Sequence, residues 1–262
     1  MGRQYGGWIW YELMTGDPEG AKAFYEPILG WEMTTGHGDT SDYGLLTAPD
    51  GAMVGGLLRL TEDMTSHGAR PCWIGYLSVA DADAEVRAIE AAGGKCLMPP
   101  RDIEMAGRVA MVADAGGTPF YVMTPRPPEG AEGESTAFRA EKTPGHCGWN
   151  ELMAADAARE IKFYTDRFGW SLPEPMDMGE YGKYQFVAHD GVTIGAIMGL
   201  MPGAPGPQWS HYFWVRSIAE AKRGIEAGGG QVVNGPMEVP GGDWIVQGID
   251  PQGAMFSLVG GA

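Results

Sequence analysis

The chain has little of several features that mark particular classes of protein. Its 262 residues include only 18 Lys and Arg against 34 Asp and Glu, for a net charge of −16. Nucleic acids and anionic membranes bind proteins through clustered Lys and Arg, so we expect neither as a partner. No apolar run approaches the roughly 20 residues of a membrane span. The N-terminal segment lacks the basic start and apolar stretch of a signal peptide, so we expect a cytoplasmic protein.

Cysteine is also scarce. Cys72, Cys96 and Cys147 form no Cys-x-x-Cys motif and leave an odd count. This usage favours a reducing compartment over a disulfide framework.

What the chain does contain is a duplication. The segment WYELM at 10–14 recurs as WNELM at 149–153, and FYEPILGW at 24–31 recurs, with the same spacing, as FYTDRFGW at 163–170. A second register relates Val79, Gly93-Gly94, Asp114 and Gly117 to Val215, Gly229-Gly230, Asp250 and Gly253. A repeat of this length indicates two copies of one folding unit.

Each copy divides again into two strand–helix–strand–strand–strand modules. Asp17-Pro18 supplies a helix N-cap and a proline at the first helical position, and Gly30 ends that helix. In the second copy Asp156 is the N-cap and Gly169 ends the helix. We therefore predict an α+β protein with a first domain at 1–125 (modules at about 8–60 and 72–125), a linker rich in Pro and Gly at 126–145, and a second domain at 146–262 (modules at about 147–200 and 209–260).

This arrangement resembles the vicinal oxygen chelate superfamily, also called the glyoxalase/bleomycin resistance protein/extradiol dioxygenase superfamily. The resemblance rests on the two FY…GW segments above and on the closing strands DAGGTPFYVM at 114–123 and DPQGAMFSLV at 250–259. It implies tandem domains in which four βαβββ modules pair into two open barrel-like clefts. The superfamily includes lyases, isomerases, dioxygenases and binding proteins, so the fold alone does not define the function.

The resemblance also implies where a metal would bind. Metal-dependent members place one ligand, usually His, in the first strand of each module and a carboxylate in the fourth strand. Here those positions hold Trp10, Ile74, Trp149, Ser210, Gly55, Tyr121, Gly195 and Ser257. None is His, Asp or Glu, the ligands that such metals favour. We therefore expect no cofactor. A divalent metal held by an unorthodox set such as Glu151, His211 and a water is the alternative.

A carboxylate accompanies each first-strand tryptophan. Because side chains alternate along a strand, Glu12 shares a face with Trp10, and Glu151 shares one with Trp149. A carboxylate in an apolar, Trp-walled site suits general acid/base chemistry. The alternative is that both glutamates are structural and brace backbone amides or an arginine.

Nine tryptophans in 262 residues also favour a ligand site with aromatic walls. Arg108 is a candidate partner for an anionic group, or a bracing residue, and His211 a hydrogen-bonding one. The full set of candidate ligand-binding residues is Trp10, Trp73, Tyr76, Arg108, Tyr121, Trp149, Asn150, Tyr184, His211, Tyr212, Trp214 and Trp244.

Three functions follow from these patterns. The leading one is binding of a small apolar or aromatic molecule by a monomer or homodimer, with possible metal-independent acid/base chemistry by Glu12 or Glu151. The second is a metal-dependent lyase, isomerase or dioxygenase. The third is a non-catalytic binding or interaction protein.

The residue types at the eight implied ligand positions predict that the purified protein carries no stoichiometric metal. Elemental analysis, combined with thermal-shift measurements over Zn, Ni, Mn, Fe(II) and Co, tests this expectation, because a ligand that binds only the native state raises its melting temperature. A stoichiometric metal, or a shift of several degrees with one ion, would instead favour the metalloenzyme.

Overall fold

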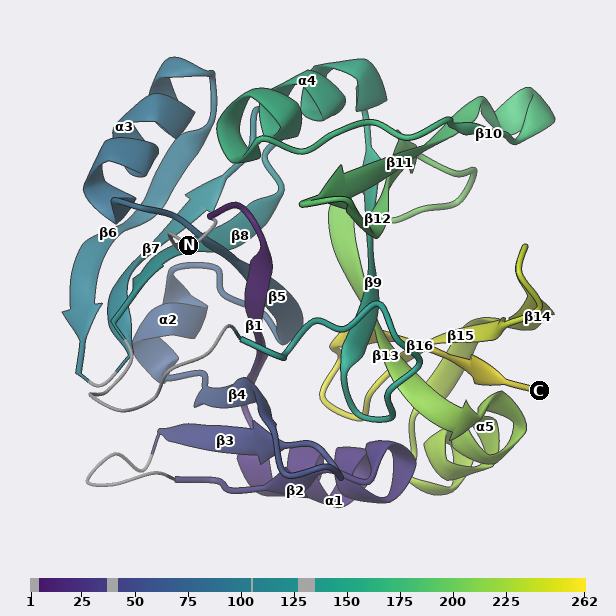
Figure 1. Ribbon diagram of the computed structural model, residues 1–262. Helices are drawn as coiled ribbons and strands as arrows, with labels where there is room; N and C mark the ends of the chain where they lie inside the picture. The colour runs from purple at the N-terminus through teal and green to yellow at the C-terminus, as the bar shows by residue number, and fades with distance from the viewer. Residues whose placement is uncertain (1–4, 37–41, 105, 127–134) are drawn as a thin grey trace. The chain divides into compact units, whose positions relative to one another are not determined.

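The computed structural model describes residues 5–36, 42–104, 106–126 and 135–262 (Figure 1). One βαβββ pattern recurs four times along it, which confirms the predicted fold class. The predicted linker at 126–145 includes 127–134, which lie outside the described residues.

The first two modules lie in the N-terminal half. Module 1 consists of β1 (Trp8–Thr15), α1 (Pro18–Leu29), β2 (Glu32–Met33), β3 (Tyr43–Thr47) and β4 (Met53–Arg59). A short helix, α2 (Glu62–Ser66), follows it. Module 2 consists of β5 (Cys72–Ser78), α3 (Ala82–Ala91), β6 (Lys95–Ile103), β7 (Gly107–Ala113) and β8 (Pro119–Pro125).

The C-terminal half repeats this order. Module 3 consists of β9 (Cys147–Ala154), α4 (Ala157–Phe168), β10 (Met176–Asp177), a 3₁₀ turn η1 (Gly179–Tyr181), β11 (Lys183–His189) and β12 (Val192–Gly199). Module 4 consists of β13 (Gln208–Ser217), α5 (Ile218–Ala227), β14 (Gln231–Glu238), β15 (Trp244–Ile249) and β16 (Met255–Gly261).

The first helix of each half begins and ends at the residues that the sequence predicts. The Asp17 side chain accepts a hydrogen bond from the Gly20 amide, and α1 ends at Gly30, whose φ is 68°. In the second copy Asp156 caps α4 and Gly169 ends it with a φ of 67°. Glycine suits both ends because a left-handed backbone strains residues that carry a Cβ.

The strands form two mixed eight-stranded sheets. Their orders are β2-β3-β4-β1-β5-β8-β7-β6 and β10-β11-β12-β9-β13-β16-β15-β14. The central pairs within modules, such as β1 with β4 and β9 with β12, are parallel, and the outer pairs are antiparallel.

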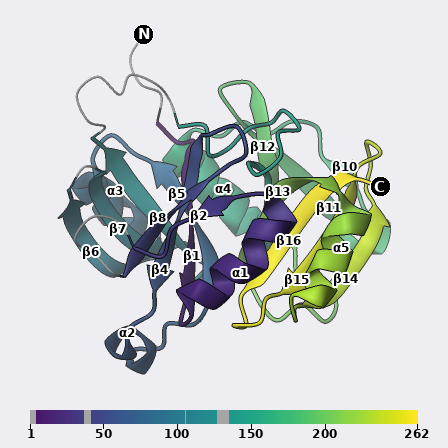
Figure 2. The ribbon, with the colours of Figure 1, turned by 90° about the horizontal axis from the view of Figure 1, so that it is seen from below.

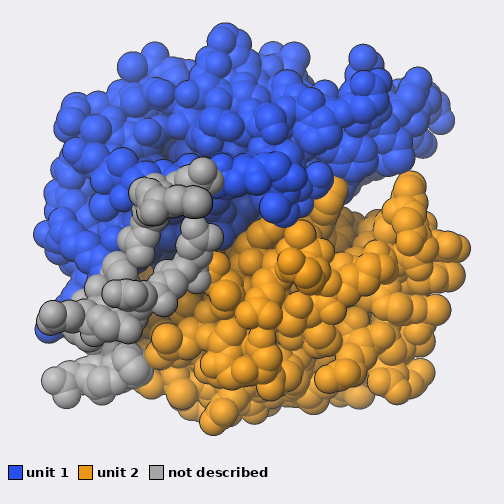
Figure 3. All heavy atoms as spheres, viewed as in Figure 1, with its two compact units in different colours: residues 1–9, 75–134, 150–209 blue, residues 10–74, 135–149, 210–262 orange. Residues whose placement is uncertain are grey.

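The chain divides into two compact units (Figure 3). Unit 1 contains residues 1–9, 75–134 and 150–209, hence most of modules 2 and 3. Unit 2 contains residues 10–74, 135–149 and 210–262, hence most of modules 1 and 4. The domain boundaries drawn from the sequence remain a prediction. None of the helices in the described ranges is long and apolar enough to cross a membrane.

The core of unit 2 is organised around a buried Trp–Tyr–Asp network. The Tyr25 hydroxyl donates to Asp250 Oδ2 at 2.9 Å and accepts from the Trp73 indole at 3.1 Å. Asp250 Oδ1 also accepts from the amides of Gln252 and Ala254 in its own turn. The network therefore ties module 4 to the helix of module 1, and Figure 2 shows α1 and α5 side by side.

Unit 1 contains the second copy of this network. The Tyr164 hydroxyl donates to Asp114 Oδ2 at 3.1 Å and accepts from the Trp209 indole at 2.8 Å. Burial raises the pKa of Tyr25 and of Tyr164 well above the usual value of 10.0, so both hydroxyls stay protonated as donors.

Replacing either buried tyrosine with phenylalanine is expected to destabilise the protein. Tyr25→Phe and Tyr164→Phe each leave a buried carboxylate oxygen and an indole N–H without their partner, at a cost of about 2 kcal/mol. Urea unfolding measures the loss, with the exposed Tyr181→Phe as the control. Loss of less than about 0.5 kcal/mol in both variants would show that the networks do not stabilise their units.

Candidate functional site

The first strand of module 1 brings together a tryptophan, a carboxylate and a tyrosine. Trp10 and Glu12 alternate with Tyr11 and Leu13 on β1, so the first two share one face. The Trp10 indole donates to the Tyr43 hydroxyl on β3 at 3.0 Å. A Cβ at Gly56, which pairs with Glu12, would lie 2.0 Å from that hydroxyl. Glycine at this position therefore makes room for the Trp10–Tyr43 contact.

Glu12 is only 2% exposed. Cys72 lies near Glu12. Burial, together with the negative charge of Glu12, raises the pKa of the Cys72 thiol to about 11. A carboxylate so deeply enclosed has little access to a ligand.

In module 3 the equivalent carboxylate has a different partner. The Tyr184 hydroxyl on β11 donates to Glu151 Oε2 at 2.6 Å, the short distance of a charge-assisted hydrogen bond. The strand pairing is the same in both copies. Phe186, two residues after Tyr184, pairs with Ala196, which pairs with Glu151. Leu45, two residues after Tyr43, pairs with Gly56, which pairs with Glu12. Tyr43 and Tyr184 therefore occupy corresponding positions in the two copies. The sequence predicted a role in the site for Tyr184 but not for Tyr43.

Glu151 is half-buried, in contrast to Glu12. Trp149 shares its face of β9 by alternation, and Asn150 points to the other face, where it donates to the Ile194 carbonyl at 3.0 Å. The second copy therefore carries the more accessible carboxylate.

Module 4 contributes an aromatic face within unit 2. Tyr212 and Trp214 on β13 pack in one cluster with Ile245 and Val259, and Trp149 packs against this cluster. Trp244, half-buried at the start of β15, is on the opposite face from Ile245.

Module 2 contributes a pair of stacked tyrosines. Tyr76 on β5 and Tyr121 on β8 are direct partners across the two strands, with ring centroids 4.3 Å apart. Arg108, by contrast, is held by Asp83 and by Asp102 at 3.3 Å. The charge of its guanidinium is therefore balanced by two carboxylates of its own module.

The structure places Trp73 and His211 in the core of unit 2. Trp73 packs on Trp31 and Phe213 in addition to its bond to Tyr25. His211 lies against the ring of Tyr11, with centroids 4.9 Å apart. Burial lowers the pKa of His211 to about 3, so the imidazole is neutral at physiological pH.

Divalent metals favour ligand sets of His, Cys, Asp and Glu side chains. In the described part of the chain no three His, Cys, Asp or Glu side chains come close enough together to hold an ion. In the structure Gly55 pairs with Tyr11, Tyr121 with Tyr76, Gly195 with Asn150 and Ser257 with Tyr212, one or two residues after the first-strand positions inferred from the sequence. None of these partners is His, Cys, Asp or Glu.

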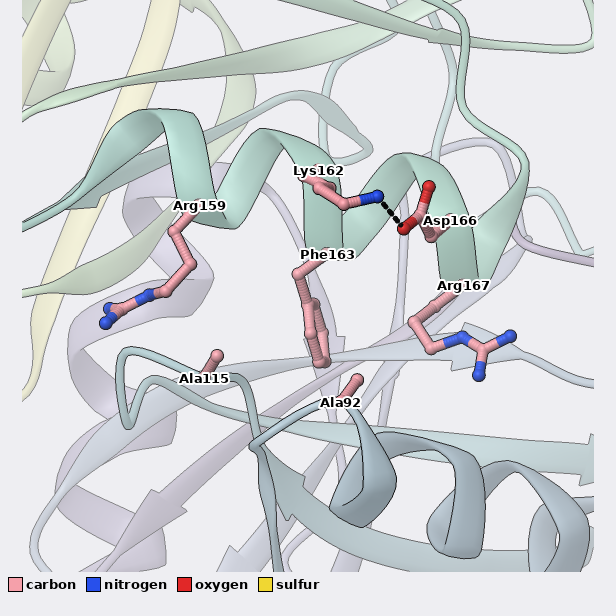
Figure 4. A pocket seen from close by; sticks show the side chains of 7 residues that line it. All are labelled: Ala92, Ala115, Arg159, Lys162, Phe163, Asp166 and Arg167. Atoms are coloured by element: carbon pink, nitrogen blue, oxygen red, sulfur yellow. Dashed lines mark hydrogen bonds and ion pairs between the residues drawn. The ribbon is translucent and has the colours of Figure 1, made fainter.

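A shallow groove in unit 1 lies apart from all the predicted site residues. It has a volume of about 400 Å³ and lies between α4, the end of α3 and the β7–β8 turn (Figure 4). Ion pairs join Lys162 to Asp166 at 2.6 Å and Arg159 to Glu160 at 2.7 Å, so its charges are largely balanced. Its lining residues are Ala92, Ala115, Arg159, Lys162, Phe163, Asp166 and Arg167.

Two polar residues near the aromatic faces were missed by sequence reasoning. Gln247 on β15 donates to the Tyr212 hydroxyl at 2.9 Å and accepts from Asn234 on β14 at 2.9 Å. The internal repeat could have indicated these two residues, because module 2 has Met111 and Met98 at the positions where module 4 has Gln247 and Asn234.

The βαβββ modules and their sheet order define an α+β protein of tandem glyoxalase-like type. The family model of the Glyoxalase/Bleomycin resistance protein/Dioxygenase superfamily matches residues 8–122 and 143–258. The chain belongs to this superfamily.

Among curated proteins it is similar to two kinds of bacterial relative. The anthracycline biosynthesis protein DauV of Streptomyces sp. (strain C5) is 32% identical over 95% of this chain and 91% of its own length. The putative glyoxylase CFP32 of Mycobacterium bovis is 28% identical over 95% of this chain and 93% of its own length.

Solved structures share the fold at low sequence identity. A Mn(II)-bound glyoxalase from Novosphingobium aromaticivorans superposes with a TM-score of 0.64 at 19% identity, over 98% of this chain and 82% of that one. An extradiol ring-cleaving dioxygenase from B. fuscum gives a TM-score of 0.67 at 16% identity, over 98% and 72%.

The buried neutral His211 predicts an acid-sensitive stability. Its folded-state pKa lies below the unfolded value of about 6.5, so the stabilisation is complete above pH 6.5 and is lost as the pH falls towards 3. Between pH 7.5 and pH 5 this loss is about 2 kcal/mol, at about 1.4 kcal/mol per unit of pH.

Urea unfolding at the two pH values measures this effect. His211→Asn should reduce the difference between the two pH values by that amount, whatever its effect on absolute stability, and the exposed His67→Asn should leave it unchanged. An equal pH dependence in wild type and His211→Asn would contradict the assignment.

Proposed function

We propose that the protein binds a small planar aromatic molecule against its Trp- and Tyr-bearing sheet faces, and that Glu151 exchanges a proton with it. The observation that carries the proposal is the hydrogen bond of 2.6 Å from Tyr184 to the half-buried Glu151. Glu151 shares its strand face with Trp149. A general base needs a fixed orientation and access to its substrate. The bond to Tyr184 fixes the orientation of the carboxylate, and its partial exposure gives access.

The aromatic side chains support the class of ligand. Beside Glu151 in unit 1, the half-buried rings of Tyr184 and Phe186 pack against each other with centroids 5.5 Å apart, and they offer aromatic surface on which a planar ring packs favourably. Two relatives at 32% identity, DauV and DnrV of Streptomyces peucetius, are named as anthracycline biosynthesis proteins. An anthracycline nucleus is a planar, oxygenated polycycle, which agrees with the chemistry of these faces.

The reaction proposed is proton transfer at an acidic position of such a ring system. A C–H bond next to an aromatic ketone breaks, its proton passes to the Glu151 carboxylate, and its electron pair delocalises onto the ketone oxygen. Return of a proton to carbon or oxygen completes the exchange. Tyr184 orients the carboxylate through its hydroxyl, as a base requires a positioning partner.

We assign Glu12 a structural role in the first copy. It is 2% exposed and lies near the half-buried Cys72, so a ligand would have to displace packed side chains to reach it. The two glutamates therefore form a matched pair of catalytic candidate and control.

Anthrone, a polycyclic ketone with an acidic methylene, is the probe for this proposal. We expect the wild-type protein to accelerate exchange of the methylene protons with deuterated water, measured by NMR. Glu151→Gln should lower the catalysed rate by about 100-fold or more, the usual contribution of a general base, with the folding transition retained. Glu12→Gln should remain within about threefold of wild type.

Separate outcomes distinguish binding from chemistry. Quenching of tryptophan fluorescence by anthrone reports binding in each variant. Binding without catalysed exchange would leave a binding protein and refute the role of Glu151. A larger loss of exchange in Glu12→Gln than in Glu151→Gln would move the site to the first copy.

A further inference from the structure

One row of side chains crosses all four strands of the module 4 half-sheet. Asn234 on β14 pairs with Gln247 on β15, Gln247 with Ser257 on β16, and Ser257 with Tyr212 on β13. Paired residues on neighbouring strands project from the same face. We call these four residues the polar row.

Hydrogen bonds link the polar row from the surface inward. Asn234 is exposed, Gln247 is 9% exposed and Tyr212 is 3% exposed. The Asn234 amide donates to Gln247 Oε1, and Gln247 Nε2 donates to the Tyr212 hydroxyl, both at 2.9 Å. Each amide nitrogen carries a second N–H, so the row is rich in donors.

The polar row lies on the face away from helix α5. Gly248 and Phe256 alternate with Gln247 and Ser257, and a Cβ at Gly248 would lie 2.7 Å from the Phe256 ring. Helix α5 contacts β14, β15 and β16. Ile245, two residues before Gln247, instead joins the Trp214 cluster against which Trp149 packs. The amides thus border the aromatic face of unit 2.

The corresponding row of module 2 has the same register and different chemistry. Met98 pairs with Met111, Met111 with Tyr121, and Tyr121 with Tyr76. The internal repeat places Met98 and Met111 where module 4 has Asn234 and Gln247. We call these four residues the methionine row. Its thioethers are flexible and make favourable contacts with aromatic rings.

We infer that the two rows give the two module faces different ligand selectivity. The polar row recognises the carbonyl and hydroxyl oxygens of an oxygenated polycyclic aromatic, and the methionine row accepts unsubstituted aromatic surface. This inference rests on the proposed binding of aromatic ligands and adds the polarity of the ligand to it. A nearly buried glutamine discriminates strongly, because a ligand without a matching oxygen leaves the second N–H of the Gln247 amide, the one not donated to Tyr212, desolvated and unpaired.

Two probes of similar shape test the inference: quinizarin, a dihydroxyanthraquinone, and anthracene, which has no oxygen. Fluorescence titrations give their affinities for the full chain. Gln247→Met, which installs the residue of the other row, should weaken quinizarin binding by about tenfold or more and change anthracene binding by less than about twofold.

Two further variants keep the test independent of folding. Asn234→Ala removes an exposed amide that orients Gln247, and should weaken quinizarin binding by about threefold without affecting the thermal transition. The matched control is Gln231→Met, the same exchange at an exposed position on β14 outside the row, which should bind both probes as wild type does.

The outcomes separate this inference from the proposed function. Selective loss of quinizarin binding in Gln247→Met and Asn234→Ala supports the polar row. Unchanged quinizarin affinity in a folded Gln247→Met protein, or equal losses for both probes, would overturn the inference and leave aromatic binding intact. Failure of the wild-type protein to bind either probe would overturn the proposed function and this inference together.

Discussion

The buried bond from a helix tyrosine to a turn aspartate is the interaction on which the rest of the structure depends. In each unit the aspartate accepts two amides of its own turn through one oxygen and a tyrosine hydroxyl through the other. A carboxylate buried without such partners would be strongly unfavourable. Because the donor and the acceptor come from different modules, satisfying this charge also brings the modules together.

The residues that hold the modules together are the same in both copies, whereas the sheet faces away from the helices differ. The capping aspartates, helix-ending glycines and Trp–Tyr–Asp networks occur in both copies, because a change at any of them exposes an unsatisfied buried group or strains the backbone. On the faces away from the helices, Gly56 is replaced by Ala196 and Met111 by Gln247. Those faces are where the two halves acquire separate chemistry.

The divergence explains why membership of the superfamily leaves the function open. Solved structures that share the fold include a Mn(II)-bound glyoxalase and ring-cleaving dioxygenases. At the positions where metal-dependent members are expected to place ligands, this chain has tryptophan, isoleucine, glycine, tyrosine and serine. The same sheets can therefore hold a metal in one protein and, as proposed here, an aromatic ring beside a carboxylate in another.

The sequence by itself determined the fold class, the repeat and the ends of α1 and α4, because caps, glycines and strand alternation are local signals. It did not indicate strands β6 and β14. The residues of β6 alternate between exposed and half-buried over 95–101, but its sequence KCLMPPRDI shows no polar/apolar alternation, and the burial of β14 is irregular. Only the tertiary structure decided that Trp73 lies in the core, that Tyr43 contacts Trp10 while Tyr184 contacts Glu151, and that Asn234, Gln247 and Tyr212 are linked. These contacts join residues far apart in the chain, and their register depends on how whole strands pair.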